Sequence, residues 1–278
     1  MKNSLVSVIV PCYNQGEFVR ECIESVLAST YDNFEIIIVN DGSTDSNTLE
    51  VLRNLQYEKT IVVNQENKGL PSARNAGISV AKGKYILPLD ADDMIMPTFL
   101  EKAVKVLEEN KKVGIVGGAT ELFGDQTGVF PLPKYKKHSF LLRNCLVCSC
   151  MFRRDDWARV GGYNPNMKLG LEDWDFWLAL IEIGRKVYQF DEVLFKYRKY
   201  GITMIGEMDE NKTRSMLLRA IDNHPKLYRW RGNYRKYIST GKYSRRRHIV
   251  DTLLRFLSCL IPVRNWRKRM RTLSKDIP

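Results

Sequence analysis

The sequence predicts an α/β fold in which a mostly parallel sheet is flanked by helices on both faces. Continuous apolar runs such as residues 6–10 are typical of strands that are buried on both sides. Segments with helical spacing alternate with these runs through the first hundred residues. The chain has 278 residues, of which 44% are hydrophobic and 27% charged, so it is long enough to bury a full core.

Each element of the regular part has its own signal. Apolar runs with β-branched or aromatic side chains predict strands at residues 6–10, 34–39, 60–64 and 85–87. Helices are expected between them at residues 18–27, 45–56 and 71–81. The apolar side chains of the first helix recur on one side, and Pro71 suits the first turn of the third.

Beyond residue 95 the alternation continues once and then breaks. A helix at 97–110 and a strand at 113–117 precede a region rich in glycine and proline, with a hairpin near 123–130. The remaining predictions are strands at 145–153, 187–190 and 193–198 and helices at 172–183 and 209–224. We divide the chain into an α/β domain at 1–205 and a basic, helical C-terminal extension at 206–278.

Three carboxylates, those of Asp90, Asp92 and Asp93, follow the strand at 85–87. They repel one another unless a cation lies between them, and oxygen ligands suit Mg²⁺ or Mn²⁺ shared with substrate phosphates. The alternative is a solvated acidic turn before the next helix. Two further polar clusters, at residues 12–14 and 41–43, also follow strands, and the carboxyl ends of parallel strands meet at one edge.

The segment after the second strand, residues 41–45, permits two interpretations. Ionised Asp41 accepts hydrogen bonds and so suits the N–H donors of a nucleobase. Alternatively, the segment only caps the next helix through Ser43 or Asp45. Arg74, about one turn into the third helix, either bridges a ligand and the carboxylates or lies on a solvated face. No phosphate-binding glycine motif of the dinucleotide or P-loop type occurs.

A second acidic cluster occupies residues 172–177. Glu172 and Asp173 suit the first turn of a helix for reasons of its dipole. Their interleaving with Trp174 and Trp177 also suits a sugar platform, with a carboxylate placed to act as a general base.

Six segments in this order resemble the family 2 glycosyltransferases of GT-A fold: residues 8–14, 41–45, 67–77, 89–93, 161–163 and 172–173. The resemblance covers roughly residues 5–205. It implies a nucleotide-sugar donor that usually carries UDP, a divalent metal (Mn²⁺ or Mg²⁺) at the D-x-D element, and inversion at the anomeric carbon.

The resemblance also implies roles for individual residues. Asp92 binds the metal, supported by Asp90, and Asp173 is the base, with Glu172 beside it. Trp174 and Asp93 are expected to meet the sugar or the acceptor. The nucleotide is expected to lie against Pro11, Tyr13, Asn14, Asp41, Gly42, Ser43, Arg74 and Asp90.

The chain departs from the family pattern near residue 200. Residues 197–204 resemble a late element of the family in which many members have a histidine near the position of Tyr200. Since this histidine is missing, Arg198 or Lys199 is expected to neutralise the leaving group. A single displacement through an oxocarbenium-like transition state then needs one base, for which Asp173 is the candidate.

The positive charge of the chain belongs to its C-terminal part. Residues 226–278 contain 16 Lys and Arg against 2 Asp and Glu, while the whole chain has a formal charge of +12. Residues 252–263 are mainly apolar but too short to span a membrane, and arginines and Trp266 flank them. This pattern predicts a segment in the interface of an anionic membrane. The alternatives are nucleic-acid binding and a solvated tail.

The cysteines set an expectation for the compartment. The six cysteines follow no disulfide pattern, and the sequence opens without the apolar segment of a signal peptide, so we expect a reducing, cytosolic location. Cys145, Cys148 and Cys150 lack the partners that would complete a zinc site, and we interpret them as part of a buried strand.

The resemblance, together with the basic C-terminal segment, implies an inverting transferase at the inner face of the cell membrane. It would move a sugar from a UDP-sugar to a hydroxyl of a lipid-linked glycan in surface-polysaccharide synthesis. One alternative is transfer to polyprenyl phosphate, for which Asp173 is unnecessary because the acceptor is already an anion. The other is a non-catalytic, membrane-tethered nucleotide-binding protein. Nucleic acid is not an expected partner, and the sequence does not specify the sugar, the acceptor or the oligomeric state.

Overall fold

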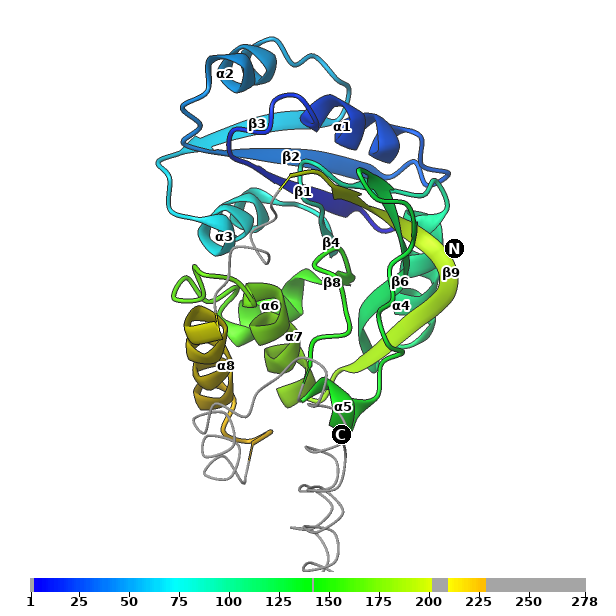
Figure 1. The fold of residues 1–278 in the computed structure, drawn as a ribbon. Coiled ribbons are helices and arrows are strands. Elements are labelled where there is room, and N and C mark those ends of the chain that lie inside the picture. Colours follow the sequence, from blue (N-terminus) through cyan, green and yellow to red (C-terminus); the bar gives the residue numbers. More distant parts are fainter. Residues whose placement is uncertain (1–2, 142, 202–209, 229–278) are drawn as a thin grey trace, which may run out of the picture. The chain divides into compact units, whose positions relative to one another are not determined.

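The computed structural model describes residues 3–141, 143–201 and 210–228. The first half contains β1 (Val6–Cys12), α1 (Val19–Leu27), β2 (Phe34–Asp41), α2 (Ser46–Arg53), β3 (Thr60–Gln65), α3 (Leu70–Val80), β4 (Tyr85–Pro88), β5 (Met94–Ile95) and α4 (Phe99–Glu109) (Figure 1). The second half contains β6 (Val113–Gly124), β7 (Gly128–Val129), α5 (Lys137–Phe140), β8 (Met151–Arg153), α6 (Arg154–Val160), α7 (Glu172–Glu182), β9 (Lys186–Lys199) and α8 (Glu210–Asn223).

These strands form one sheet in the order β3-β2-β1-β4-β8-β6-β9-β5, and β7 pairs with β6. Strands β3, β2, β1 and β4 are parallel, with Val8 of β1 aligned between Ile36 and Leu87. In the second half, β8 is antiparallel to both β4 and β6, β6 and β9 are parallel, and β5 is antiparallel to β9. The predicted parallel sheet is therefore confirmed for the first half, whereas the second half is mixed.

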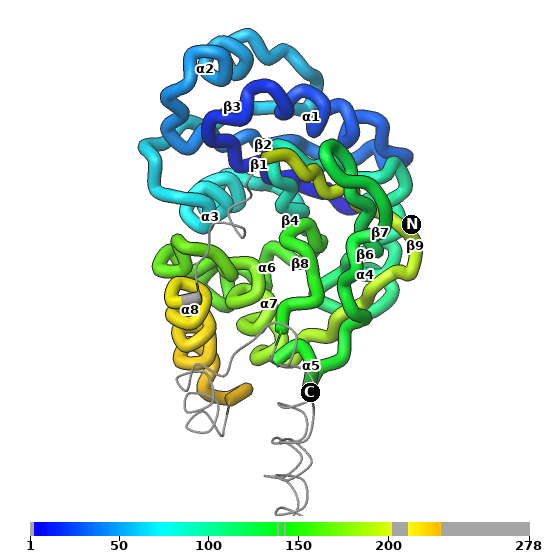
Figure 2. The backbone as a smooth tube through the Cα atoms, in the orientation of Figure 1, coloured from blue at the N-terminus to red at the C-terminus, as the bar shows by residue number. Residues whose placement is uncertain are grey.

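Helices cover both faces of the parallel strands (Figure 2). On one face, alternate residues of β1 such as Val6 and Val8 belong to a core that includes α1 and α4. On the other face, α3 approaches Ile9 so closely that a Cβ at Gly77 would lie 2.5 Å from the Ile9 Cγ2. A glycine at this position therefore lets the helix lie directly on the sheet.

The predictions need correction in two regions, and some elements were missed. In the segment 145–153, only Met151–Arg153 forms a strand. The preceding apolar residues are buried in a loop, and the Asn144 side chain stabilises the turn of this loop by accepting from Leu146 N at 3.0 Å. The two short strands predicted at 187–198 form one long strand, β9, with irregular register opposite β6. Strand β5 and helices α5 and α6 have no counterpart among the predicted elements.

The C-terminal extension is described only as far as Tyr228. The helix predicted at 209–224 is confirmed as α8, and its end packs against α7 through a contact of 3.1 Å between His224 Nε2 and Asp175 Oδ1. The membrane-interface segment expected from residues 245–271 lies outside the described residues. Within the described part of the chain, we find no helix with the length and apolarity needed to cross a bilayer.

Candidate active site

Asn14 joins the ends of β1 and β2 at the carboxyl edge of the sheet. Its Oδ1 accepts from the backbone N–H groups of Thr44 at 2.8 Å and Asp45 at 3.1 Å, and its own N–H donates to Ser43 Oγ at 3.1 Å. Asn14 has a φ of 53°, a left-handed conformation that asparagine tolerates. Two of the predicted nucleotide-binding segments therefore lie side by side, with Pro11 buried in β1 and Tyr13 exposed beside Asn14.

The Asp41 carboxylate organises the loop between β3 and α3. It is buried and accepts from Gln65 Nε2 at 2.6 Å and from the backbone N–H groups of Lys68 and Gly69, both at 2.9 Å. Gly42 has a φ of +69°, and a Cβ there would lie 2.6 Å from Asn67 N. The cap of α2 is Asp45, as one of the two interpretations proposed, because its side chain accepts from Asn47 N and Thr48 N.

The acidic turn after β4 contains one fully buried carboxylate and two partly buried ones. Asp93 is buried, and its Oδ1 accepts from Arg198 N at 2.9 Å. Burial and the neighbouring charges of Asp92 and Asp90 raise the pKa of Asp93 well above its usual range. Burial, followed by the charge of Asp90, raises the pKa of Asp92 to about 6. These acids are not a fully solvated turn, which favours the cation interpretation.

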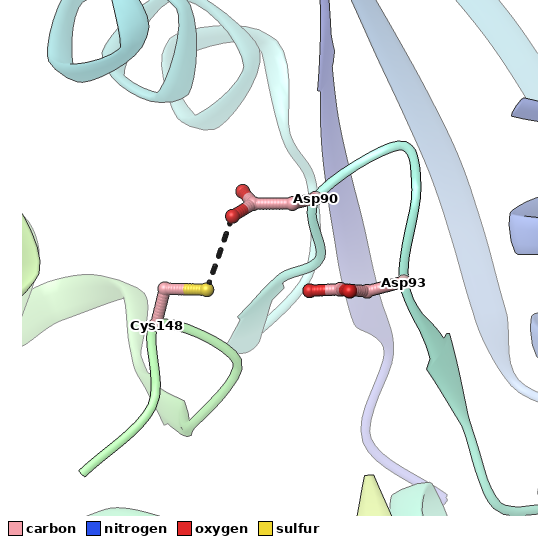
Figure 3. Close-up of side chains that lie close together, drawn as sticks. All are labelled: Asp90, Asp93 and Cys148. Atoms are coloured by element: carbon pink, nitrogen blue, oxygen red, sulfur yellow. Dashed lines mark hydrogen bonds between the residues drawn. The ribbon is translucent and has the colours of Figure 1, made fainter. Parts of the chain in front are cut away.

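The structure brings a sulfur atom to this turn. Cys148 Sγ lies 3.2 Å from Asp90 Oδ2, and the candidate ligand atoms of Asp90, Asp93 and Cys148 lie within 4.8 Å of one another (Figure 3). Asp93 Oδ2 has no hydrogen-bond partner among the described residues. This set of donors fits a divalent cation, but Asp92, the metal ligand that we expected from the sequence, is not in the group.

Arg74 is fully buried and connects the acidic turn to α7. Its Nη2 donates to Asp90 Oδ1 at 2.7 Å and its Nη1 donates to Glu172 Oε1 at 2.6 Å. Burial alone lowers the pKa of Arg74, but the two carboxylates outweigh it, so the pKa is raised and the side chain stays charged. The solvated-face alternative is wrong. The Arg74 side chain has no exposed surface, so the direct contact with the nucleotide that we expected is not available to it. Arg74 instead orients Asp90 and Glu172.

Asn75, next to Arg74, holds the glycine-containing loop before α7. Its Oδ1 accepts from Tyr163 N and from Trp157 Nε1, both at 2.9 Å, and its Nδ2 donates to Tyr163 O at 2.7 Å. Gly162 has a φ of +80°, and a Cβ there would lie 2.7 Å from Asn75 Oδ1. The Tyr163 ring then stacks on Phe176, with ring centroids 4.2 Å apart, so this loop is tied to α7.

Asp173 lies in the first turn of α7 and is partly exposed. Its Oδ1 accepts from Trp174 N at 2.6 Å, and its Oδ2 accepts from Asn144 Nδ2 at 3.0 Å. Burial, followed by the charge of Glu172, raises the pKa of Asp173 to about 7, although Arg74 opposes the rise. A carboxylate with such a pKa is suited to accept a proton near neutral pH.

The expectation that Trp174 forms a sugar platform is wrong. A platform needs an exposed ring face, but Trp174 is 2% exposed and Trp177 is fully buried. The Trp174 Nε1 donates to Phe140 O at 3.0 Å, and the two rings meet edge to face. Both tryptophans therefore belong to the core beneath Asp173.

Arg198 fastens β9 to the acidic turn. Its Nε donates to Asp92 O at 2.8 Å, its guanidinium pairs with Glu21, and it lies between the rings of Phe18 and Phe123 at 4.7 and 4.2 Å from their centroids. The charge of Arg198 thus already has a partner. The Lys199 Nζ lies 4.5 Å from the centroid of the Tyr197 ring.

Two contributors to this site were not predicted from the sequence, namely Asn144 and Cys148. The only signal was the Cys145-x-x-Cys148-x-Cys150 spacing, which we set aside because no further cysteines or histidines complete a zinc site. The partners of these residues are carboxylates that are distant in sequence, at Asp173 and Asp90.

Comparison with known proteins identifies relatives of this chain. A family model described as "Glycosyl transferase family 2" matches residues 7–158. A putative glycosyltransferase, EpsE, of Bacillus subtilis (strain 168) is 33% identical over 233 residues, covering 80% of each chain. An uncharacterized glycosyltransferase of Haemophilus influenzae is 30% identical over 234 residues, covering 77% of this chain and 72% of the relative.

Solved structures support the fold. Crystal structures of S. aureus TarS 1-349 resemble this chain, and the one in complex with UDP-GlcNAc has a TM-score of 0.63 at 18% sequence identity, covering 79% of this chain and 67% of TarS 1-349. The GT-A type of fold expected from the sequence is thereby confirmed.

Proposed function

The chain belongs to glycosyl transferase family 2, and we propose that it transfers a sugar, with inversion, from a UDP-sugar to a hydroxyl group of a glycan acceptor. The observation that carries this proposal is the placement of Asp173. It is a partly exposed carboxylate with a pKa raised to about 7, linked through Glu172 and Arg74 to the acidic turn at Asp90.

The donor is proposed from the polar segments at the carboxyl edge of the sheet. Asn14, Ser43 and the loop organised by Asp41 lie there together, and the TarS structures with UDP-GlcNAc and with UDP support a uridine nucleotide. A divalent cation, Mn²⁺ or Mg²⁺, held by Asp92 and Asp90 would supply positive charge to the leaving diphosphate. Arg74 keeps Asp90 in position, and Arg198 fixes the backbone of the same turn.

The residues of this chain then account for a single displacement. Asp173 accepts the proton of the acceptor hydroxyl, whose oxygen forms a bond to the anomeric carbon. The bond from that carbon to the diphosphate oxygen breaks, and the leaving diphosphate takes the electron pair. An acceptor phosphate would not need Asp173, so the placement of this base favours a hydroxyl acceptor over polyprenyl phosphate.

For the acceptor, we propose a lipid-linked glycan of a surface polysaccharide, with the enzyme at the inner face of the cell membrane. The basic, partly apolar segment at residues 245–271 supports this proposal through its sequence alone.

A thermal-shift screen of nucleotide sugars tests the donor. The full-length protein is heated with Mn²⁺ and, in turn, UDP-sugars, GDP-sugars and UMP. A ligand at 100 times its Kd adds about 2.7 kcal/mol to the free energy of unfolding, so we expect a UDP-sugar to raise Tm by a few degrees. The stabilising donor should then be consumed, with release of UDP, when glycan acceptors are added. No stabilisation by any nucleotide sugar would contradict the proposal.

A further inference from the structure

Cys148 is an unexpected chemical group beside the acidic turn after β4. The loop between α5 and β8 carries it to the end of β4, where its Sγ lies 3.2 Å from Asp90 Oδ2 and 3.6 Å from Ser149 Oγ. Cys145 in the same loop is buried, and within the described residues it belongs to no group of side chains placed to hold a metal ion. The position of Cys148 against two aspartates is therefore specific to this cysteine and not a general property of the loop.

Asp93 supplies an independent sign that this cluster takes a ligand. Its side chain has no exposed surface, and its Oδ2 has no hydrogen-bond partner within the described part of the chain. In Figure 3 the Asp93 carboxylate points toward the space between Asp90 and Cys148. Burying a carboxylate without a partner is costly, and a bound cation removes that cost.

We propose that Asp90, Asp93 and Cys148 form a binding site for a thiophilic divalent cation such as Zn²⁺. A thiolate is a soft ligand that favours Zn²⁺ or Co²⁺ over Mg²⁺, and the two carboxylates complete a set of three protein ligands with one open position. Donor atoms around such an ion lie about 3.5 Å apart, given metal–ligand bonds of about 2.0–2.3 Å. The ligand atoms of the three residues lie within 4.8 Å of one another, so small side-chain rotations are enough to bring them to this spacing.

The surrounding contacts prepare these ligands. Arg74 holds Asp90 Oδ1 and leaves Oδ2 on the side of Cys148, and the N–H of Arg198 holds Asp93 Oδ1 and leaves Oδ2 free. Such outer contacts orient metal ligands. On binding, the Cys148 thiol gives its proton to solvent and a sulfur–metal bond replaces the S–H···O contact with Asp90. The site does not include Asp92, but it shares Asp90 with the cation proposed for sugar transfer.

Titration of the nucleotide-free, full-length protein with Co²⁺ tests this site. We expect a thiolate-to-cobalt charge-transfer band in the near ultraviolet that Zn²⁺ abolishes and a large excess of Mg²⁺ does not. Cys148→Ser should remove the band and weaken Co²⁺ binding at least about tenfold. Asp93→Asn should weaken it similarly, whereas Cys145→Ser, the control in the same loop, should leave both the band and the affinity unchanged.

A second measurement does not depend on the variants being folded. In the wild-type protein, Zn²⁺ should protect Cys148 from iodoacetamide, as read by mass spectrometry of the peptide, while Mg²⁺ should not. Absence of the charge-transfer band, persistence of the band in Cys148→Ser, or alkylation of Cys148 unaffected by Zn²⁺ would each overturn the proposal. Because no nucleotide is present, these results are separate from success or failure of the donor screen.

Discussion

Asp90 and Glu172 bind different nitrogens of the same buried guanidinium, that of Arg74, at 2.7 and 2.6 Å. Asp90 belongs to the acidic turn after β4, and Glu172 precedes the proposed base at the start of α7. A buried charge with two fixed partners has little freedom to move, so this contact sets the position of the acidic turn relative to the first turn of α7. Arg74 is therefore a positioning residue for both sides of the proposed reaction.

Replacing Arg74 should damage stability and activity together. Arg74→Met leaves Asp90 and Glu172 without their buried cation, and breaking a buried ion pair in this way costs about 3–5 kcal/mol. Arg74→Lys should recover only part of this loss, because an ammonium group cannot reproduce the planar fork that reaches both carboxylates. Urea unfolding and initial transfer rates measure the two effects. Arg159→Gln, at an exposed position on α6, is the control. If Arg74→Met were as stable as Arg159→Gln, the ion pairs of Arg74 would be dispensable for stability.

Asp173→Asn should abolish transfer while nucleotide binding survives. The amide keeps the size of the side chain and can still accept from Trp174 N, but it cannot take a proton from an acceptor hydroxyl. General-base catalysis contributes about 10²–10⁴-fold to rate, so we expect a loss of at least this size in kcat. Asp155→Asn, on the exposed start of α6, is the matched control. Near-full turnover by Asp173→Asn would exclude this residue as the base.

Transfer should depend on pH with an apparent pKa of about 7. The base acts only when ionised, and burial together with the Glu172 charge raises the pKa of Asp173 to about 7. Activity should therefore be full above this pKa and fall tenfold for each pH unit below it. Glu172→Gln removes a neighbouring negative charge, so the acidic limb should move to lower pH. A profile of kcat/KM against pH checks both points, and an acidic limb near pH 4 in the wild type would contradict them.

Gly42 and Gly69 allow a matched test of the loop that Asp41 organises. Both have positive φ, of +69° and +85°, but a Cβ at Gly42 would lie 2.6 Å from Asn67 N, while nothing lies within 4 Å of one at Gly69. Alanine is strained at both positions by about 1–3 kcal/mol, at Gly69 because its φ of 85° and ψ of 162° suit essentially only glycine, and only Gly42→Ala also displaces the loop. We expect Gly42→Ala to lower Tm more than Gly69→Ala does. We also expect Gly42→Ala to bind UDP more weakly than Gly69→Ala, as measured by calorimetry. Equal effects would show that backbone strain alone matters.

Local patterns were sufficient to predict the first half of the fold. The continuous apolar strands and the helical spacing of residues 18–27 specify elements that the structure reproduces within a few residues. The loop at 145–150 was misassigned because a buried apolar loop and a buried strand have the same composition, and its path depends on side-chain contacts such as Asn144 with Leu146 N.

For the site as well, features that depend on local sequence were predictable, and features that depend on contacts between distant residues were not. The sequence places Asp90, Asp92 and Asp173 at element ends, where a functional role is readable from position. It does not show that Trp174 faces the core or that Arg74 is fully buried, because both depend on packing against distant elements. The contact of Cys148 with Asp90 joins residues that no local pattern relates.

The basic extension should hold the protein on anionic membranes, and the structure indicates where to cut it. Tyr228 is buried and its hydroxyl donates to Leu141 O at 2.7 Å, so a chain ending at Tyr228 keeps this contact and the His224–Asp175 contact. We expect the full-length chain to sediment with vesicles that contain phosphatidylserine, and less so at high salt, because each cation near such a surface contributes about 1 kcal/mol. The shortened chain should stay in the supernatant with an unchanged circular dichroism melting curve. A full-length variant with Arg245, Arg246 and Arg247 changed to glutamine should bind at an intermediate level. Sedimentation of the shortened chain with the same vesicles would assign membrane binding to the α/β unit instead.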